Sequence, residues 1–350
     1  MTRETNPGRR RFLATAAATI AGLEVAMLGA TKSVLHGMGI VTDNGLASLR
    51  SATTWLNSPP LTADGLRGKV VLVDFCTYTC VNWLRTLPYL RAWDAKYREH
   101  GLVVIGAHTP EFDFEHDLDN VRRAITAMRV DFPIAVDNDY AIWNGFSNQY
   151  WPALYLIDAK GVIRFTHFGE GAYDESERTI QQVLGELGAK GFSPELVTVD
   201  ARGLEVAADW GNLRSPENYL GSARTEGFRM DRDASRLGVN QWTLDGDWKQ
   251  SPHTVALNKP NGRIVYRFHA RDLNLVMGPA ARGASVRFRV WIDGQAAGGG
   301  ADVDVDAQGN GVVTEQRTYQ LIRQARPIVD RQFEIEFLDP GVEAFCFTFG

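Results

Sequence analysis

The chain has 350 residues, of which 44% are hydrophobic and 23% are charged, proportions typical of a folded globular protein. This length favours two domains over a single core. The formal net charge is −5, and basic residues cluster only within the first dozen positions, so nothing indicates a nucleic-acid partner.

The first element in chain order is an arginine cluster, Arg9 to Arg11, followed by Phe12-Leu13 and an Ala/Thr-rich apolar run. This pattern resembles a twin-arginine export signal. Glu24 interrupts the run, which is shorter than the ~20 residues of a membrane-spanning helix. We therefore expect residues 1–30 to direct export to the periplasm or cell envelope without a stable transmembrane span. A short membrane anchor and a buried helix are the alternatives.

Residues 31–65 contain the loop-like "LNSPPLTADGLRGK" and predict an N-terminal extension with a short edge strand or hairpin. From Lys69 onward, strand and helix patterns alternate. They are the buried strand "KVVLVDFC", a helix over 80–100, the strand "GLVVIGAHT", the helix "HDLDNVRRAITAMRV", the strand "FPIAVD", the hairpin "PALYLIDAKGVIRFTHFG" and the helix "DESERTIQQVLGELGAK". This order predicts an α/β thioredoxin-like domain over residues 66–195.

The C-terminal part of the chain changes to strand runs of period two, separated by Gly, Asp and Pro turns. Examples are "GRIVYRFHARDLNLVMG", "ASVRFRVWIDGQ" and "RQFEIEFLDPGVEAFCFTFG". We therefore predict a linker over residues 196–215 and an all-β sandwich over residues 216–350.

The chain's chemistry is expected at "CTYTCVNW", where the first buried strand meets the first long helix. Cys80 is predicted to begin this helix, where unpaired N–H groups and the helix dipole favour a thiolate and lower its pKa. Cys80 is thus a candidate attacking thiol. An inert cysteine at a helix start is the alternative.

Cys76 ends the strand, on the same side as Asp74. An extended chain from Cys76 to Cys80 would separate their Cα atoms by roughly 13 Å, whereas a disulfide needs about 4.4–6.8 Å. A bridge therefore requires residues 77–79 to form a turn. Asp74 lies in an apolar strand, where a buried acid either moves protons during thiol exchange or hydrogen-bonds to a loop.

Two further features belong with this corner of the chain. Trp151-Pro152 precedes a strand, and a cis bond there would turn a backbone edge toward an incoming sulfur. An ordinary trans loop proline is the alternative. The third cysteine, Cys346, alternates with aromatic residues in "EAFCFTFG", which predicts a small buried strand residue.

Several motifs together resemble the exported thioredoxin-like (redoxin, TlpA-type) portion of DipZ-type cytochrome c biogenesis proteins and their stand-alone relatives. They are "FCTYTCVNWLRTLPYL", "HTPEFDFEHDLDNVRRA", "NQYWPALYLIDAKGVIRFTHFGEG", "ENYLG", "RFHARDLNLVMGP" and "FLDPGVEAFCFTFG". The resemblance covers residues 55–350. It implies a thioredoxin fold, thiol-disulfide exchange with a protein partner, no cofactor beyond redox-active cysteines, a cis Pro152, and a sandwich similar to carbohydrate-binding modules.

The chain departs from this family at the corner itself, where the family pattern is Phe-Trp-Thr-Tyr-x-Cys-x-Asn-Cys. The family's first cysteine falls on Cys80, its resolving cysteine on Trp83, and its tryptophan on Cys76. Cys76 would then have to act as the resolving thiol. The predicted catalytic residues are Cys80, Cys76 and Asp74, and the residues predicted to shape the site are Thr77, Tyr78, Trp83, Trp151 and Pro152.

The favoured hypothesis is an exported thiol-disulfide oxidoreductase with an altered Cys-x-x-x-Cys motif. The alternative is a non-catalytic extracytoplasmic binding protein that uses its sandwich, with Trp242, Trp248 and Tyr319 as candidates for stacking on sugars. Aromatic residues in a β-sandwich are more often part of the core.

A minor alternative is a peroxiredoxin-like peroxidase. Thr77 matches the threonine of Pro-x-x-x-Thr-x-x-Cys, but Val73 occupies the proline position. The acidic "VDVDAQGNG" would suit calcium or a solvated hairpin tip equally well. No metal site is predicted.

Overall fold

The computed structural model describes residues 45–230, 233–297 and 303–350. The predicted export signal, residues 1–30, lies outside the described residues. All of the described residues belong to one compact unit. None of the helices among the described residues is long and apolar enough to cross a membrane.

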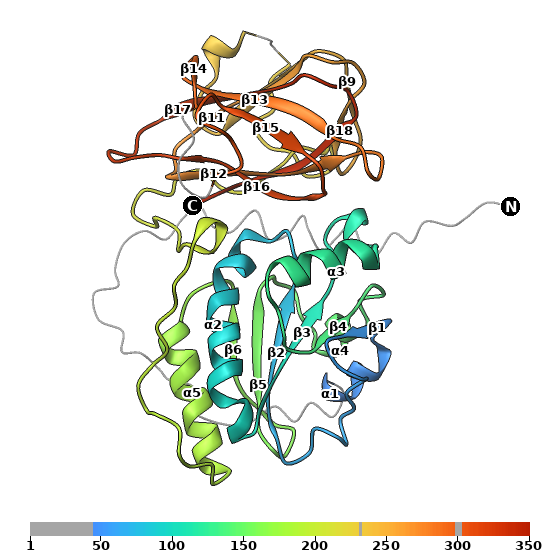
Figure 1. The fold of residues 1–350 in the computed structure, drawn as a ribbon, viewed down its shortest axis with the longest axis vertical. Coiled ribbons are helices and arrows are strands. Elements are labelled where there is room, and N and C mark those ends of the chain that lie inside the picture. Colours follow the sequence, from blue (N-terminus) through green and yellow to red (C-terminus); the bar gives the residue numbers. More distant parts are fainter. Residues whose placement is uncertain (1–44, 231–232, 298–302) are drawn as a thin grey trace, which may run out of the picture. The chain divides into compact units, whose positions relative to one another are not determined.

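The first domain is built on a six-stranded sheet with the order β1-β4-β3-β2-β5-β6 (Figure 1). Strands β2, β3 and β4 run parallel to one another, and β1, β5 and β6 each pair antiparallel with their neighbours. Every residue of the central strand β2 is buried, as its unbroken apolar run predicts. The strand bounds are β1 Thr54–Leu56, β2 Val70–Cys76, β3 Leu102–His108, β4 Ile134–Val136, β5 Ala153–Ile157 and β6 Ile163–Phe168.

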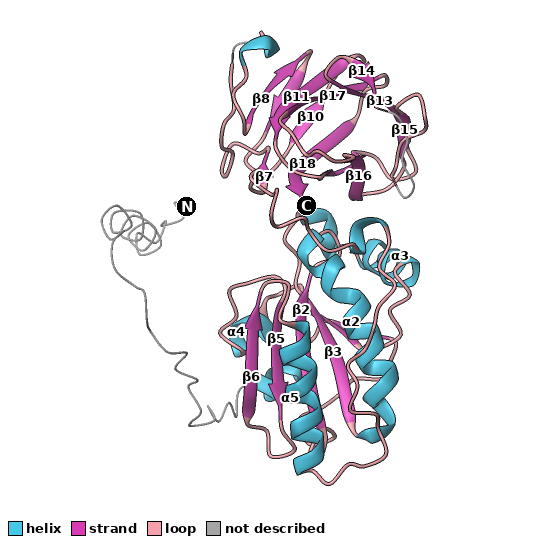
Figure 2. Cartoon of the chain, turned by 90° about the vertical axis from the view of Figure 1, so that its left-hand side faces the viewer, coloured by secondary structure: helices cyan, strands magenta, loops and turns pink. Residues whose placement is uncertain are grey.

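Helices cover both faces of this sheet, which confirms the predicted thioredoxin-like α/β class (Figure 2). Helices α2, α3 and α5 pack on one face, while α1 and α4 pack on the other. The bounds are α1 Gly45–Ser48, α2 Val81–Tyr97, α3 Leu118–Ala127, α4 Ala141–Gly145 and α5 Tyr173–Glu186, with short 3-10 turns at η2 Leu49–Ser51, η3 Arg98–His100, η4 Asp113–His116, η5 Gly203–Glu205 and η6 Ala234–Arg236. The sequence did not predict α1 and α4, because such short helices carry no periodic pattern.

Helix α2 is anchored by its apolar face. Leu84, Leu87, Leu90 and Trp93 all join the core cluster between the helices and the sheet, as their spacing predicts. The Trp93 indole is fully buried and donates a hydrogen bond to Glu177 of α5 at 3.2 Å. Firm packing of this helix fixes the position of its first turn, where Cys80 lies.

The second domain is a sandwich of two antiparallel sheets, as predicted. One has the order β16-β12-β18-β10-β9, with β7 beside β18, and the other has the order β14-β13-β17-β11-β8, with β15 beside β13. Trp242 and Tyr319 are fully buried, so the core interpretation of these aromatics is confirmed. The bounds are β7 Asn218–Tyr219, β8 Gln241–Asp245, β9 Trp248–Gln250, β10 Val255–Leu257, β11 Gly262–Phe268, β12 Asp272–Pro279, β13 Val286–Ile292, β14 Gln295–Ala296, β15 Asn310–Val313, β16 Arg317–Arg323, β17 Arg331–Phe337 and β18 Val342–Phe349.

The two domains share a hydrophobic core, to which the last strand contributes. The Phe345 ring packs on the rings of Phe112 and Phe114, with centroid distances of 5.3 and 4.8 Å. The Thr318 hydroxyl donates to the carbonyl of Thr79 at 2.7 Å. The sandwich therefore lies directly against the loop that precedes Cys80.

Candidate active site

The turn between β2 and α2 places Cys80 at the start of the helix, as predicted. The Cys80 N–H donates to the Thr77 carbonyl at 3.1 Å, and the Cys80 carbonyl accepts the first helical hydrogen bond, from Leu84, at 3.0 Å. Cys80 itself keeps an extended conformation as the N-cap residue. The segment from Thr77 to Thr79 therefore does bend into a turn.

A buried carboxylate, Glu115, holds this turn in place. Its Oε1 accepts hydrogen bonds from the N–H and hydroxyl of Thr79, at 3.3 and 2.6 Å. Its Oε2 accepts from the N–H groups of Glu111 and Phe112, at 2.7 and 2.9 Å. Burial raises the pKa of Glu115, against hydrogen bonds that favour its ionised form. Sequence analysis missed this residue, because an acid in "EFDFEHD" resembles an ordinary surface loop.

Asp74 and Trp83 form a bonded pair beneath the turn. Both are fully buried, and the Trp83 indole N–H donates to Asp74 Oδ2 at 2.6 Å. Burial raises the pKa of Asp74 well above its ordinary value, and the hydrogen bond from Trp83 offsets only part of this effect. Trp83, which takes the position of the family's resolving cysteine, is thus hydrogen-bonded to the buried Asp74.

Cys76 lies in the core and not at the surface. Its side chain is fully buried, and its sulfur is so close to Gly106 of β3 that a Cβ atom there would lie 3.6 Å from it. Burial, then the charges of Asp74 and Cys80, raise the pKa of the Cys76 thiol well above its ordinary value. All three cysteines are free thiols. The resolving role of Cys76 stays a prediction, and its burial weighs against it.

Cys80, Trp151 and Pro152 come together as predicted. Cys80 is half-buried, and its thiol donates a long hydrogen bond, 3.9 Å, to the Trp151 carbonyl. The Trp151–Pro152 bond is cis, as the resemblance implies. The Trp151 indole donates to the Thr109 carbonyl at 3.1 Å and packs against Trp143, with ring centroids 4.2 Å apart. The sulfur of Cys80 is therefore held beside a fixed backbone edge.

Thr77 and Tyr78, also predicted to shape the site, lie deeper than Cys80. Both are buried, and the Tyr78 ring stacks on His108 with a centroid distance of 5.8 Å and an interplanar angle of 16°. Burial raises the pKa of the Tyr78 hydroxyl and lowers that of His108 to about 4. These side chains support the turn from the core and do not reach its exposed side.

The predicted lowering of the Cys80 pKa was wrong. Burial is the largest influence and raises the pKa of the thiol, and the charges of Glu217 and Glu111 raise it further. Hydrogen bonds from the N–H groups of Trp83 and Asn82 act in the opposite direction but are outweighed. The sequence alone does not reveal that the second domain brings Glu217 to the helix start.

Glu217 belongs to a charged cluster beside Cys80. The Tyr219 hydroxyl donates to Glu111 and, at 3.2 Å, to Glu217. The guanidinium group of Arg224 lies 3.4 Å from the Tyr219 ring centroid and forms an ion pair with Glu111 at 2.9 Å. The surrounding protein and the charge of Glu111 raise the pKa of the Glu217 carboxyl to about 7. A proton acceptor suited to neutral pH therefore lies near the thiol.

An open groove of about 600 Å³ adjoins the start of α2. Trp210 retains 64% of its surface exposed on one side of this groove. Val81 and Asn82, the two residues that follow Cys80, line the groove, whereas Cys80 itself does not. Its lining includes Val81, Asn82, Arg85, Trp210, Glu217 and Phe349.

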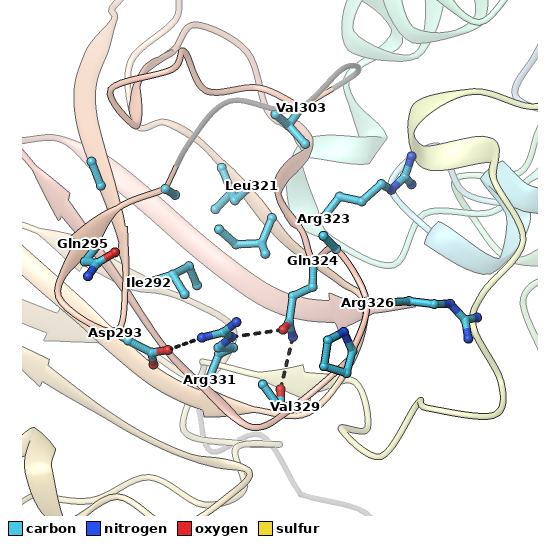
Figure 3. A pocket seen from close by; sticks show the side chains of 15 residues that line it. Ile292, Asp293, Gln295, Val303, Leu321, Arg323, Gln324, Arg326, Val329 and Arg331 are labelled. Atoms are coloured by element: carbon cyan, nitrogen blue, oxygen red, sulfur yellow. Dashed lines mark hydrogen bonds and ion pairs between the residues drawn. The ribbon is translucent and has the colours of Figure 1, made fainter.

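A second groove, of about 640 Å³, lies in the sandwich (Figure 3). Arg331 lies between Asp293 and Gln324, paired with Asp293 at 2.7 Å and hydrogen-bonded to Gln324 at 3.2 Å. None of the described residues that line it is aromatic, so they offer no surface for stacking on a sugar ring. Trp248 is half-buried and does not line this groove. Its indole N–H donates a hydrogen bond to the Asp245 carbonyl.

Both carboxylates of the acidic "VDVDAQGNG" segment have protein partners. Asp304 pairs with Arg317 at 2.7 Å, and Asp306 accepts from the N–H groups of Gln308 and Asn310. In the part of the chain that the structure describes, no group of three or more His, Cys, Asp or Glu side chains is arranged to hold a metal ion. These contacts are those of a hairpin tip.

Comparison with known proteins assigns both domains. Residues 57–166 match the AhpC/TSA family, and residues 215–350 match the family described as thioredoxin like C-terminal domain. Protein DipZ from Mycobacterium bovis and from Mycobacterium tuberculosis is 36% identical over 239 residues, which are 66% of this chain and 34% of DipZ. The chain thus contains a thioredoxin-like redoxin domain homologous to DipZ, and it spans about a third of the length of that relative.

Other similar proteins match a smaller share of this chain. The thiol-disulfide oxidoreductase YkuV of Bacillus subtilis is 26% identical over 141 residues, covering 40% of this chain and 95% of YkuV. The solution structure of a thioredoxin-like protein in its oxidised form is 28% identical with a TM-score of 0.36, covering 38% of this chain and 90% of that one. The resemblance identified from the motifs is confirmed.

Proposed function

We propose that this protein is a thiol-disulfide oxidoreductase in which Cys80 is the attacking thiol. The position of Cys80 carries the proposal: it is half-buried at the N-terminus of α2, with its sulfur beside the Trp151 carbonyl. Homology to DipZ and similarity to a named thiol-disulfide oxidoreductase support it. The partner is a protein that presents a disulfide or a thiol in the groove beside Cys80.

The reaction begins with loss of the Cys80 proton. Burial keeps the thiol protonated at rest, and the carboxylate of Glu217 is placed to accept the proton when a partner docks. The thiolate, stabilised by the N–H groups of Asn82 and Trp83, attacks one sulfur of the partner's disulfide. A Cys80–partner mixed disulfide forms, the partner's own disulfide breaks, and the released partner thiolate takes the proton from Glu217, which returns to its carboxylate form.

The buried pair beneath the turn restricts how this mixed disulfide is released. Trp83 carries no thiol, so the helix position that resolves the mixed disulfide in the DipZ pattern does not do so here. Asp74 remains a proposed proton carrier, although its Oδ2 is bonded to Trp83. The mixed disulfide must therefore be released by a thiol from elsewhere.

We also infer that the protein acts outside the cytoplasm, on the strength of the arginine-led segment at residues 1–30.

The second candidate function is a non-catalytic binding protein that uses the sandwich. The groove of Figure 3 is the observation that favours it, but the groove has no aromatic residue among its described lining residues and so gives little support to a glycan ligand.

Trapping of the mixed disulfide tests the proposal. The reduced full chain is incubated with insulin, quenched with acid, alkylated and analysed by non-reducing electrophoresis and mass spectrometry. We expect an insulin adduct at Cys80 that is absent from Cys80→Ser and retained in the matched control Cys76→Ser. An adduct level unchanged by Cys80→Ser would contradict the proposal. A complete lack of adduct would favour the non-catalytic binding protein.

A further inference from the structure

Cys346, the third thiol, lies on the side of the sandwich that packs against the redox domain. Along β18, Ala344 and Phe347 join the sandwich core, whereas Phe345 and Cys346 both join the core of the first domain. The pairing of β12 with β18 shifts at this point, so two successive residues are turned to the same face. The bulge thus directs Cys346 toward the domain that contains Cys80.

Neighbouring strands place Cys346 in a row of residues that meet the active-site loops. Cys346 pairs with Val276 on one side and with Tyr219 on the other, and Val276 pairs in turn with Thr318. Thr318 donates to the carbonyl of Thr79, the residue before Cys80. Adjacent strands lie about 4.8 Å apart, and two such steps separate Cys346 from Thr318. The backbone of Cys346 is therefore roughly 10 Å from that of Thr318, the residue that contacts this turn.

The same carboxylates act on both thiols. Glu217 and then Glu111 are the charged groups with the largest influence on Cys80 and on Cys346. The Cys346 thiol donates to the Phe347 carbonyl at 3.4 Å, and Tyr219, which pairs with Cys346 across the strands, donates its hydroxyl to Glu217 at 3.2 Å. Cys80 packs against the cluster to which the buried Cys346 belongs. Glu217 is therefore a shared neighbour of the two sulfurs.

We propose that Cys346 is the resolving thiol for Cys80, a role that rests on the exchange function proposed above. Cys346 gives its proton to Glu217 and attacks the Cys80 sulfur of the mixed disulfide. The Cys80–Cys346 bond forms and the Cys80–partner bond breaks, and the second partner thiolate takes the proton. Two enzyme thiols are thereby oxidised while one partner disulfide is reduced to two thiols. The resulting bridge links the two domains covalently.

This assignment differs from the use of Cys76 in where the thiol lies, since both side chains are buried. Cys76 is enclosed by β2, β3 and the helices, with its sulfur against Gly106. Cys346 lies instead at the contact between the domains, beside the charged cluster and the loop of Cys80. Bridge formation requires Cys80 to leave the Trp151 carbonyl and the two sulfurs to approach to about 2 Å.

The experiment uses the full chain as wild type and as Cys346→Ala, Cys346→Ser, Cys76→Ala and Cys80→Ser. Each reduced protein is mixed with oxidised glutathione, quenched with acid, alkylated, digested and analysed by mass spectrometry. We expect a Cys80–Cys346 peptide pair in wild type and in Cys76→Ala. The pair is lost from both Cys346 variants, in which glutathione bound to Cys80 accumulates several-fold above wild type.

The outcomes separate the two proposals. If glutathione is bound to Cys80 equally in wild type and in both Cys346 variants, or if wild type shows Cys76–Cys80 peptides in place of Cys80–Cys346, the resolving role is overturned and the exchange function remains. If Cys80 forms no adduct in any variant, the exchange function itself is overturned. Circular dichroism and thermal unfolding of both Cys346 variants verify that the comparison is made between folded proteins.

Discussion

The interior and the rim of the turn between β2 and α2 differ in chemistry. In the interior, Asp74, Cys76 and Trp83 are fully buried, and the indole N–H of Trp83 donates to one carboxyl oxygen of Asp74. At the rim, Cys80 keeps partial exposure and meets Glu217 from the second domain. Relative to the family pattern that the motifs resemble, a tryptophan occupies position 83 and a cysteine position 76, so the second thiol lies in the strand and not in the helix.

Restoring the family arrangement is expected to have the largest effect. Trp83→Cys alone should create a cavity that lowers the free energy of unfolding by about 3–5 kcal/mol. The double variant Cys76→Trp/Trp83→Cys should recover much of this stability and form a disulfide between Cys80 and the cysteine introduced at position 83, with insulin reduction faster than in wild type. Urea denaturation and a turbidity assay measure the two effects. A stable double variant without faster insulin reduction would show that the swap is not what limits exchange.

The hydrogen bond inside the buried pair provides the next test. Trp83→Phe keeps most of the ring but removes the N–H that donates to Asp74 Oδ2, while Asp74 Oδ1 already has no partner among the described residues. We expect the free energy of unfolding to fall by about 1–3 kcal/mol. The same substitution in an Asp74→Ala background should have a much smaller effect. Equal losses in the two backgrounds would mean that the indole contributes only its packing.

The charge of Asp74 provides a third test, in the pH dependence of stability. The pKa of Asp74 is raised in the folded state, so the unfolded chain ionises first as pH rises above the ordinary value of 3.8. This group therefore lowers stability progressively as pH increases. Asp74→Asn should be more stable than wild type near neutral pH and lose that advantage in acid. Urea midpoints measured across this range would refute the assignment if the difference did not vary with pH.

Much of this corner is predictable from local sequence, but its electrostatics are not. The apolar run from Val70 and the spacing of Leu84 and Leu87 predict the strand, the helix and the position of Cys80 between them. Glu115 and Glu217 act on the turn from loops distant in sequence, and no periodic pattern marks such residues. The sign of the Cys80 pKa shift depends on burial and on Glu217, which only the packing of the second domain determines.

The smallest expected effect lies at the rim, where Glu217 acts on Cys80 through its charge. Because its pKa is about 7, Glu217 is mostly protonated in mild acid and becomes a carboxylate above neutrality, where it opposes the thiolate. Glu217→Gln should therefore leave alkylation of Cys80 by iodoacetamide unchanged below pH 7 and speed it a few-fold above pH 7. Peptide mass spectrometry over this pH range reports Cys80 separately from the buried thiols. An equal acceleration at all pH values would assign the effect to altered packing. An acceleration confined to alkaline pH would show that the Glu217 carboxylate of the second domain controls the reactivity of Cys80 in the first.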